Sequence, residues 1–349
     1  MTSVSIRRTR PREPQRAAPE MPATGPLVDR FGRVHRDLRI SLTDRCSLRC
    51  TYCMPEQGNE WLARQSILTS DEIERVARIA AGLGITTFRL TGGEPLLRRD
   101  LVDIVGRLGR IAGSEVAMTT NAIGLDRMLP ALLDAGLARL NISPDTLHAE
   151  RFRDLTRRDR LRDVLRGIDA AAGSGIAALK LNAVAMRGIN DDELVELVEF
   201  AISKGAQMRF IEQMPLDAGH TWSRENMVTR EEILAALSAR WDLEPIPGRG
   251  GAPAETWRIG AAHSVGVIAS VTAPFCGACD RMRLTADGHL RNCLFSTTED
   301  DLVPALRGEA SDADIARRLR ASVWGKLPGH AIDDPGFLQP VRGMNAIGG

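Results

Sequence analysis

Hydrophobic residues in the first two thirds of the chain follow two alternating patterns. Short runs that are apolar throughout or at every second position predict strands, and longer stretches with apolar residues every three or four positions predict helices. The predicted strands are 37–43, 85–90, 115–119, 138–143, 177–184 and 207–212. The predicted helices are 69–84, 100–112, 126–135, 161–173 and 191–204, the first of them opened by the capping-box pattern Thr69–Glu72.

Strands that alternate with helices favour a parallel sheet, because right-handed crossovers place the helices on its outer face. The fold class that we expect is therefore α/β, with six βα units in an incomplete (βα)6 TIM-type barrel. In such sheets the functional groups gather beyond the carboxyl ends of the strands. A C-terminal extension follows, with a loop at 217–227, a helix at 230–240, a Gly- and Pro-rich stretch at 244–255, a hairpin at 256–271 and helices at 299–308 and 311–324.

Three parts follow from this pattern. Residues 1–27 are rich in Arg, Pro and Ala, lack hydrophobic periodicity, and are predicted to form a disordered N-terminal tail. A transit peptide would also be Arg-rich, but the whole chain is, and Ser is sparse here. Residues 28–215 should form the partial barrel, and residues 216–349 a C-terminal region.

Composition narrows the class of protein. The chain has 349 residues, 43% of them hydrophobic and 26% charged, as expected of a globular protein. No run of 18 apolar residues occurs, so we expect no membrane span. The net charge of +1 argues against nucleic-acid binding. Nearly all basic residues are arginine, and the three lysines, Lys180, Lys204 and Lys326, therefore stand out.

All six cysteines fall into two tight triplets, Cys46, Cys50 and Cys53, and Cys276, Cys279 and Cys293. Such close spacing is poor for disulfides and good for metal ligands, which predicts a reducing, cytoplasmic location. A [4Fe–4S] cluster is normally held by four thiolates. A three-cysteine site therefore leaves one iron open for another ligand, and we expect the chemistry there.

The second triplet leaves an alternative open. His289 precedes Cys293 by four residues and could complete a Cys3His zinc site. The presence of the first triplet favours a second iron–sulfur cluster in the C-terminal extension. Arg281 and Arg283 follow at a spacing of two, which puts both on one face of an extended segment, where they could bind a phosphate chain or simply lie in solvent.

Other polar residues share one rim of the predicted sheet. Gly92 and Gly93 follow a strand, where missing side chains let a ligand approach the backbone. Thr119 and Ser143 end two further strands, and Lys180 lies within the next. Each is unremarkable alone, and their common position gives them weight.

Several motifs resemble a known family. Cys46-x3-Cys50-x2-Cys53, with Tyr52 before the last cysteine, and Thr91–Pro95 (TGGEP) resemble the radical S-adenosylmethionine (SAM) superfamily. Within it, the chain resembles the GTP 3′,8-cyclase family of molybdenum cofactor biosynthesis over about residues 28–349. The stretches that carry this likeness are Asp37–Ser41, Thr43–Cys46, Phe210–Glu212, the second triplet with its Arg-x-Arg, and the final Gly348–Gly349.

The resemblance implies roles for individual residues and two [4Fe–4S] clusters with SAM as cofactors. The first cluster would be held by Cys46, Cys50 and Cys53, and the second by Cys276, Cys279 and Cys293. SAM would be bound by Tyr52, Gly93, Ser143 and Met214. GTP would be bound by Arg39, Arg89, Thr119, Lys180, Arg281 and Arg283, with the tail glycines Gly348 and Gly349 reaching the active site in support.

The resemblance also implies a reaction and partners. A 5′-deoxyadenosyl radical would remove hydrogen from C3′ of GTP, and the C3′ radical would add to C8. Reduction of the resulting radical would give (8S)-3′,8-cyclo-7,8-dihydroguanosine 5′-triphosphate. Expected partners are a reductant such as flavodoxin or ferredoxin, the next enzyme of the molybdopterin pathway, and a second copy in a possible homodimer. The alternative is a radical SAM peptide maturase with an auxiliary cluster, and a non-catalytic zinc protein is a third reading.

Three positions depart from the family pattern. Thr87 stands where the family commonly has a lysine, which removes one possible phosphate contact. Pro144 and Met282 replace a usual leucine and a usual small residue. None of them is a cluster ligand, so we expect effects on affinity and not on reaction type.

Overall fold

The centre of the molecule is one mixed β-sheet. We describe a computed structural model, in which residues 20–217 and 219–348 are described. The strand order is β12-β11-β10-β1-β2-β3-β4-β5-β6-β9-β8-β7, so the sheet is open, with β12 and β7 at its two ends. The strands are β1 (Asp37–Ser41), β2 (Thr87–Thr91), β3 (Glu115–Thr120), β4 (Leu137–Ile142), β5 (Ala178–Ala185), β6 (Gln207–Glu212), β7 (Leu243–Ile246), β8 (Glu255–Ile259), β9 (His263–Ile268), β10 (Arg281–Leu284), β11 (His289–Arg291) and β12 (Asp300–Asp301).

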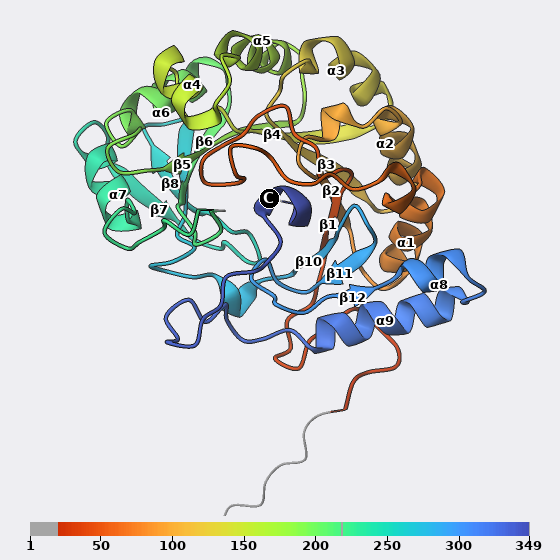
Figure 1. The fold of residues 1–349 in the computed structure, drawn as a ribbon. Helices are drawn as coiled ribbons and strands as arrows, with labels where there is room; N and C mark the ends of the chain where they lie inside the picture. The colour runs from red at the N-terminus through yellow and green to blue at the C-terminus, as the bar shows by residue number, and fades with distance from the viewer. Residues whose placement is uncertain (1–19, 218, 349) are drawn as a thin grey trace, which may run out of the picture.

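The helices cover the outside of this sheet. In Figure 1, α1 to α6 lie in an arc around the strands, and α8 and α9 lie beside β11 and β12. The helices are α1 (Ser70–Gly82), α2 (Leu101–Gly109), α3 (Leu125–Asp134), α4 (Ala149–Thr156), α5 (Leu161–Ala172), α6 (Leu194–Ser203), α7 (Arg230–Ser238), α8 (Val303–Arg307), α9 (Asp312–Trp324) and α10 (Met344–Ile347).

Strands β1 to β6 are parallel neighbours in chain order, which agrees with the predicted βα alternation. Two later strands extend this parallel set at either side. β9 pairs with β6, and β10 pairs with β1, both in parallel. Strands from the C-terminal extension therefore continue the same sheet at both sides of the six-stranded unit.

Side chains along each strand point alternately to the two faces of the sheet. One face packs on the helix-covered apolar core, and the other faces the inside of the sheet. On β1, Leu38 and Ile40 are fully buried in the apolar core that the helices cover. Arg39 lies between them and points to the opposite face, because successive side chains of a strand alternate. β2 repeats this arrangement around Arg89. The helices thus pack on aliphatic side chains while cations face inward.

Local signals predicted most elements. The capping box of Thr69 and Glu72 is present at the start of α1, and the predicted hairpin corresponds to the antiparallel pair β8 and β9. The short helices α4 and α10 were not predicted. α4 is only eight residues long and strongly charged, with three buried residues, so few apolar positions mark it in the sequence. β7, within the Gly- and Pro-rich stretch, was also missed, as were β10, β11 and β12. The start of the helix predicted at 299–308 was wrong, because β12 occupies residues 300–301 and α8 begins at Val303.

The N-terminal prediction is only partly within the described residues. Residues 1–19 of the predicted tail lie outside them. Further on, the carbonyl oxygens of Gly25 and Pro26 accept hydrogen bonds from Arg320, and the backbone N–H of Leu27 donates to Leu83. Leu27 is fully buried. The packed part of the chain therefore begins before residue 28.

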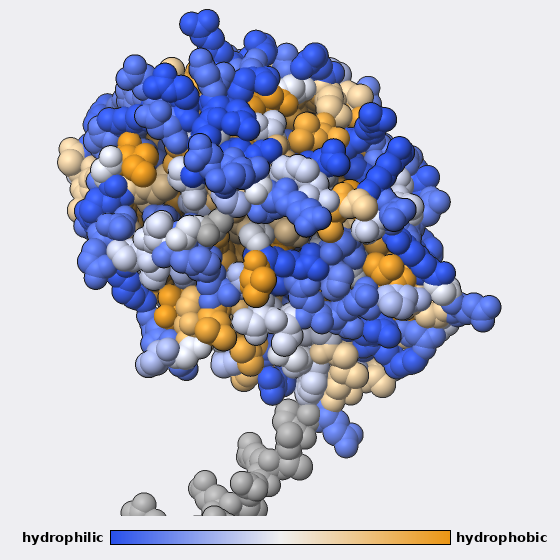
Figure 2. Space-filling model, viewed as in Figure 1, coloured by the Kyte–Doolittle hydropathy of each residue, from blue (hydrophilic) through white to orange (hydrophobic). Residues whose placement is uncertain are grey.

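The surface is largely polar. Figure 2 shows a face dominated by hydrophilic residues, with hydrophobic residues in small separate groups. Leu338 and Val341 are the most exposed large hydrophobic residues among those described. None of the helices within the described residues has the length and apolar character needed to cross a membrane.

Candidate functional site

The first cysteine triplet lies in the loop that follows β1. The backbone N–H of Cys53 donates to the Cys50 carbonyl (3.0 Å), which makes a tight turn between two of the thiols. Arg49 fixes the start of the loop, because its guanidinium donates to the carbonyls of Cys46 (2.7 Å) and Leu48 (2.8 Å). The loop is therefore shaped by backbone contacts, and the Cys46 sulfur also accepts from the backbone N–H of Leu48 (3.4 Å) and from Asn121 Nδ2 (3.8 Å).

Burial raises the pKa values of the thiols in the first triplet. It raises the pKa of Cys46 to about 11, with a further contribution from the charge of Glu94. It raises the pKa of Cys53 to about 12 and that of Cys50 well above its usual value, the latter also through Asp145. Ionisation of these thiols therefore needs the positive charge of a bound metal centre.

The second triplet lies in a short turn before β10, which holds Cys276 and Cys279, and just after β11, where Cys293 follows. Burial, together with the charges of Cys293 and Cys279, raises the pKa of Cys276. Burial opposes ionisation of Cys279 as well, but the positive charges of Arg281 and Lys326 outweigh it and lower the pKa of this thiol to about 6. This triplet is thus surrounded by cations.

The sulfur atoms of the two triplets can be compared with the geometry that a single zinc ion requires. Four-coordinate zinc with bonds of about 2.3 Å would hold its thiolates about 3.8 Å apart. In the described part of the chain, no three cysteine sulfurs lie within 4.8 Å of one another, with or without His289. The Nδ1 atom of His289 instead lies 3.4 Å from a carboxylate oxygen of Asp287. All six cysteines are free thiols, and a wider, multi-iron centre fits each set.

Both triplets line one cavity of about 330 Å³ on the inner side of the sheet. The four predicted SAM contacts line it too. They are Tyr52, Gly93, Ser143 and Met214. Five of the six predicted GTP contacts are also in the lining, namely Arg39, Arg89, Thr119, Arg281 and Arg283. The structure therefore brings together residues that are far apart in the sequence.

The glycine loop after β2 is held against the first cysteine loop. The backbone N–H of Gly93 donates to the Thr43 carbonyl (2.7 Å). A β-carbon on Gly93 would overlap the carbonyl of Arg45, and one on Gly92, whose φ is 146°, would lie 2.5 Å from the Thr43 carbonyl oxygen. Only glycine permits this approach of two backbones.

Two buried carboxylates, which the sequence analysis did not single out, line the cavity. Glu94 accepts hydrogen bonds from Thr120 Oγ1 (2.6 Å) and the backbone of Asn121 (2.7 Å), and burial raises its pKa to about 7. Asp145 accepts from Tyr52 Oη (2.6 Å), and burial raises its pKa. Glu94 follows the glycine pair directly, which is the signal that could have identified it.

A layer of cations crosses the inner face of the sheet. Strand register places Arg283, Arg39 and Arg89 side by side on β10, β1 and β2, and Arg139 two strands further, across from Ala117. Burial, with the charges of Arg283 and Arg281, lowers the pKa of Arg39 well below its usual value. Each of these cations lowers the pKa of its neighbours, and together they favour binding of an anion.

Lys180 belongs to this layer but does not line the cavity. Burial, together with the charges of Arg209, Arg139 and Arg89, lowers its pKa to about 8. Arg209 lines the cavity but was not predicted from the sequence. Arg139 was not predicted either. In an arginine-rich chain a strand arginine carries little information by itself, and only the register across several strands shows that these residues share a face.

A segment near the end of the sequence enters the cavity region, where Figure 1 shows α10 at the centre of the ring of strands. Asn345 donates through Nδ2 to the Asp44 carbonyl (2.9 Å), and the Ile347 carbonyl accepts from Arg283 Nη1 (3.3 Å). A β-carbon on Gly348 would lie 2.5 Å from Ser41 Oγ and would overlap the Thr91 hydroxyl. Gly349 lies outside the described residues.

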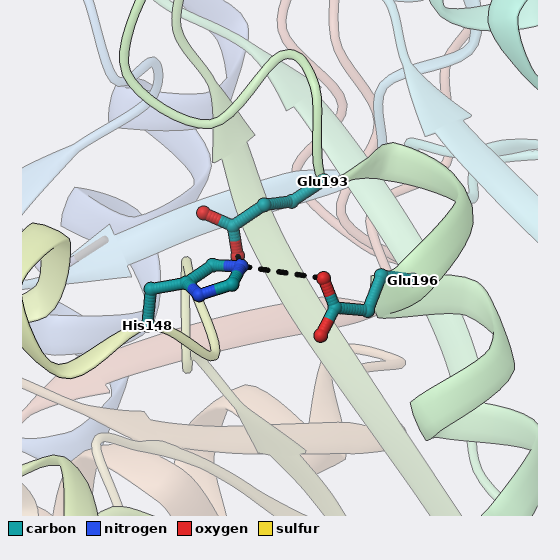
Figure 3. A group of neighbouring side chains, drawn as sticks. All are labelled: His148, Glu193 and Glu196. Carbon is teal, nitrogen blue, oxygen red and sulfur yellow. Dashed lines mark hydrogen bonds and ion pairs between the residues drawn. The ribbon is translucent and has the colours of Figure 1, made fainter.

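A separate group on the surface has the composition of a metal site. Figure 3 shows His148, Glu193 and Glu196 pointing toward one another, with His148 Nε2 3.3 Å from Glu196 and 3.7 Å from Glu193. The Glu193 carboxylate also accepts from Arg151 (2.7 Å) and from the hydroxyl of Thr146 (2.7 Å). The Glu193 oxygens already accept these hydrogen bonds. We therefore interpret the group as a contact between α4 and α6 and not as a ligand site.

Comparison with known proteins identifies two family models. Residues 40–201 match the Radical SAM superfamily, and residues 206–332 match Molybdenum Cofactor Synthesis C. The chain is 55% identical over 328 residues to the GTP 3′,8-cyclase of Streptomyces coelicolor, which covers 93% of this chain and 96% of that relative. It is 53% identical over 338 residues to the GTP 3′,8-cyclase of Mycobacterium sp. (strain KMS), which covers 96% of this chain and 97% of the relative.

Solved structures show the fold at lower identity. Streptococcus suis SuiB bound to S-adenosylmethionine is 16% identical, with a TM-score of 0.60, over 88% of this chain and 67% of that one. SuiB bound to the precursor peptide SuiA is similar at 14% identity and a TM-score of 0.60. At this identity the likeness concerns the α/β fold alone.

Proposed function

The chain belongs to the GTP 3′,8-cyclase family of the radical SAM superfamily, and from this premise we propose that two [4Fe–4S] clusters at opposite sides of one cavity cyclise GTP. The product is (8S)-3′,8-cyclo-7,8-dihydroguanosine 5′-triphosphate, an intermediate of molybdenum cofactor biosynthesis. The observation that carries the proposal is that a single cavity is lined by both cysteine triplets and by the cationic layer between them.

Cys46, Cys50 and Cys53 hold the first cluster, and Cys276, Cys279 and Cys293 hold the second. When bound, the first cluster with SAM supplies a 5′-deoxyadenosyl radical, and the second supplies an open iron for the guanine of GTP. The chain's own contribution is to orient the two small molecules and to exclude water around them. The burial that raises the pKa of the first triplet supports a dry environment there.

The SAM end of the cavity is formed by residues near the first triplet. Gly93 offers bare backbone beside the cysteine loop, and Tyr52 is fixed by its hydrogen bond to Asp145. Ser143 and Met214 complete the predicted set. Glu94, which is buried and accepts three hydrogen bonds, holds the strand ends around this pocket in position.

The GTP end is formed by the cations. Arg39, Arg89, Arg281 and Arg283 bind the triphosphate, because forked guanidinium groups match phosphate oxygens and bind them through charge-assisted hydrogen bonds. Buried Nε atoms of Arg39 and Arg281 have no partner in the described chain and are available to an anion. Thr119 and Lys180 complete the predicted set, and we add Arg209. Its side chain replaces part of the charge that Thr87 does not supply.

The segment that ends at Gly348 supports the reaction by closing the cavity beside Arg283. The contact between Arg283 and the Ile347 carbonyl joins this segment to the triphosphate site. That Gly349 reaches the active site stays a prediction.

The fold supports the same assignment. Residues 28–215 form an incomplete TIM-type barrel that carries the first cluster, and residues 216–349 carry the second. β9 and β10 extend this barrel from the C-terminal region, so both parts contribute to the cavity wall.

Further partners follow from the reaction. Cleavage of SAM needs one electron, and the cyclised nucleotide radical needs a second electron with a proton. We assign both electrons to a reductant such as flavodoxin or ferredoxin, and the product passes to the next enzyme of the pathway. Free thiols at all six cysteines support a reducing, cytoplasmic location. A homodimer, and the lack of a nucleic-acid or membrane partner, stay predictions. Sedimentation of the reconstituted chain tests the first of these.

The decisive experiment incubates the anaerobically reconstituted and reduced chain with SAM and GTP. We expect about eight irons per chain, together with 5′-deoxyadenosine and a cyclised nucleotide in equal amounts. Deoxyadenosine without any GTP-derived product would instead favour the alternative of a peptide maturase. Four irons with one zinc would contradict the two-cluster proposal.

A further inference from the structure

Lys326 is buried beside the second cysteine triplet, although lysine is rare in this chain. Its exposed fraction is 3%. The Nζ atom donates to Cys279 Sγ (3.3 Å) and to the Arg281 carbonyl (2.7 Å). Lys204, in contrast, pairs with Asp169 at the end of α6. Lys326 therefore applies its charge directly to a proposed cluster ligand.

The segment that carries Lys326 is fastened to the cysteine turn by a second buried cation. Arg33 donates to the carbonyls of Cys276 (2.6 Å) and Leu327 (2.7 Å), and it is paired with Asp29 at 2.5 Å. The single guanidinium of Arg33 thus contacts both the residue after Lys326 and the first cysteine of the triplet. The approach of Lys326 to Cys279 is a fixed part of the packing.

A cation hydrogen-bonded to a cluster thiolate favours the reduced state. Reduction adds one negative charge to the cluster, and a nearby positive charge stabilises it more strongly in a buried site than in water. In the described chain no Lys or Arg side chain donates to a sulfur of the first triplet: Arg49 donates to the Cys46 carbonyl, and the carboxylates of Glu94 and Asp145 act on the thiols with the opposite sign. The two clusters should therefore differ in reduction potential.

We propose that Lys326 raises the reduction potential of the second cluster by donating a charged hydrogen bond to the Cys279 sulfur. The inference rests on the proposed two-cluster function. Arg281 also donates to this sulfur (3.3 Å), but it is a proposed GTP contact and cannot be tested separately. Lys326 does not line the cavity, so its substitution leaves the SAM and GTP contacts in place.

The test compares the full chain with the variants Lys326→Gln, Lys326→Arg and Lys204→Gln, all reconstituted anaerobically. Iron is counted, and each cluster is titrated with a chemical reductant while its electron paramagnetic resonance signal is recorded. The second cluster's signal is assigned in a chain with Cys46, Cys50 and Cys53 replaced by serine. If that chain does not fold, the titration is performed with both clusters present, because the first cluster's signal serves as an internal reference.

Removal of the charge in Lys326→Gln should lower the ratio of reduced to oxidised second cluster at a fixed potential by about tenfold, equivalent to about 59 mV. Lys326→Arg keeps a cation and should stay close to the native ratio, and the matched control Lys204→Gln should be unchanged. An unchanged ratio in Lys326→Gln, or an equal shift in Lys326→Arg, would overturn the inference.

Loss of the second cluster is also informative. Loss in Lys326→Gln with retention in Lys326→Arg supports a need for the cation, whereas loss in both variants shows a packing role and overturns the inference. If the native chain holds only about four irons, the two-cluster function itself fails. About eight irons with an unchanged potential in Lys326→Gln would reject the role of Lys326 alone.

Discussion

The two cysteine triplets offer equal numbers of thiols to one cavity but lie in different electrostatic surroundings. Beside the first, burial and the carboxylates of Glu94 and Asp145 hold the pKa values of the thiols above their usual range. Beside the second, Arg281 and Lys326 lower the pKa of Cys279 to about 6 despite its burial. The ligand set alone therefore does not define the role of such a site, because cations contact a sulfur only in the second triplet of the described chain.

Removal of one thiol from each triplet should have the largest effect on activity. Cys50→Ser should reduce both SAM cleavage and GTP cyclisation to background. Cys279→Ser should keep SAM cleavage and lose the cyclised nucleotide, because the second cluster is assigned to the substrate. Chromatography of 5′-deoxyadenosine and the nucleotide product measures both, and iron should fall from about eight to about four per chain in each variant. Equal loss of deoxyadenosine in both variants would contradict the division of roles.

The cationic layer is assigned to the GTP end of the cavity. Arg89→Gln should raise the KM for GTP by about 10- to 100-fold, since a hydrogen bond to a charged group contributes about 1.5–3 kcal/mol. The KM for SAM should stay near the native value. Arg240, which pairs with Glu199 on the surface, provides the control variant Arg240→Gln. A larger change for SAM than for GTP would place Arg89 at the wrong end of the cavity.

Gly348 tests whether the inserted segment serves the reaction. Gly348→Ala should lower kcat by about tenfold, because its β-carbon would meet Ser41 and Thr91. The positive φ adds backbone strain of about 1 kcal/mol. Gly25→Ala is the matched control, since Gly25 has a similar φ of 79° with open space around it. Steady-state rates and melting temperatures of both variants separate the contact from the strain. Equal rates in both would remove the assigned role.

The smallest expected effect is a pH dependence of GTP binding through Lys180. In the free chain, burial and the charges of Arg209, Arg139 and Arg89 lower the pKa of Lys180 to about 8. A bound triphosphate would raise that pKa, so its contribution to affinity is complete below pH 8 and declines as the pH rises above it. Equilibrium binding between pH 7 and pH 9 should show a loss of a factor of about three to ten. Lys180→Arg should flatten the profile, and an unchanged slope would exclude Lys180 as its source.

The parts of the molecule that depend on local pattern could be predicted from the sequence. Alternation of apolar and polar positions predicted the strands and helices of the βα units, and the Thr69 capping box predicted the start of α1. Spacing alone identified both cysteine triplets. These features need only the geometry of a few neighbouring residues.

Features that depend on long-range register could not be predicted in this way. Arg139 and Arg209 look like ordinary strand residues until the sheet aligns them with Arg89 and Lys180. Lys326 stood out only as a rare lysine, and its approach to Cys279 depends on how the segment after α9 returns to the cysteine turn. Such contacts come from tertiary packing, for which a single sequence offers no local signal.

The parallel pairing of β10 with β1 also has a consequence for how the protein is made. Asp37 and Leu38 emerge from the ribosome long before Arg281 and Met282, their partners in the register. Until β10 is synthesised, one edge of β1 presents unpaired N–H and C=O groups, which is the kind of edge that pairs with other chains and aggregates. This step joins segments that are far apart in sequence and is therefore slow. Chaperone protection of the nascent chain is most valuable in this interval, and the wall of the cavity is completed last on the side that carries the second triplet.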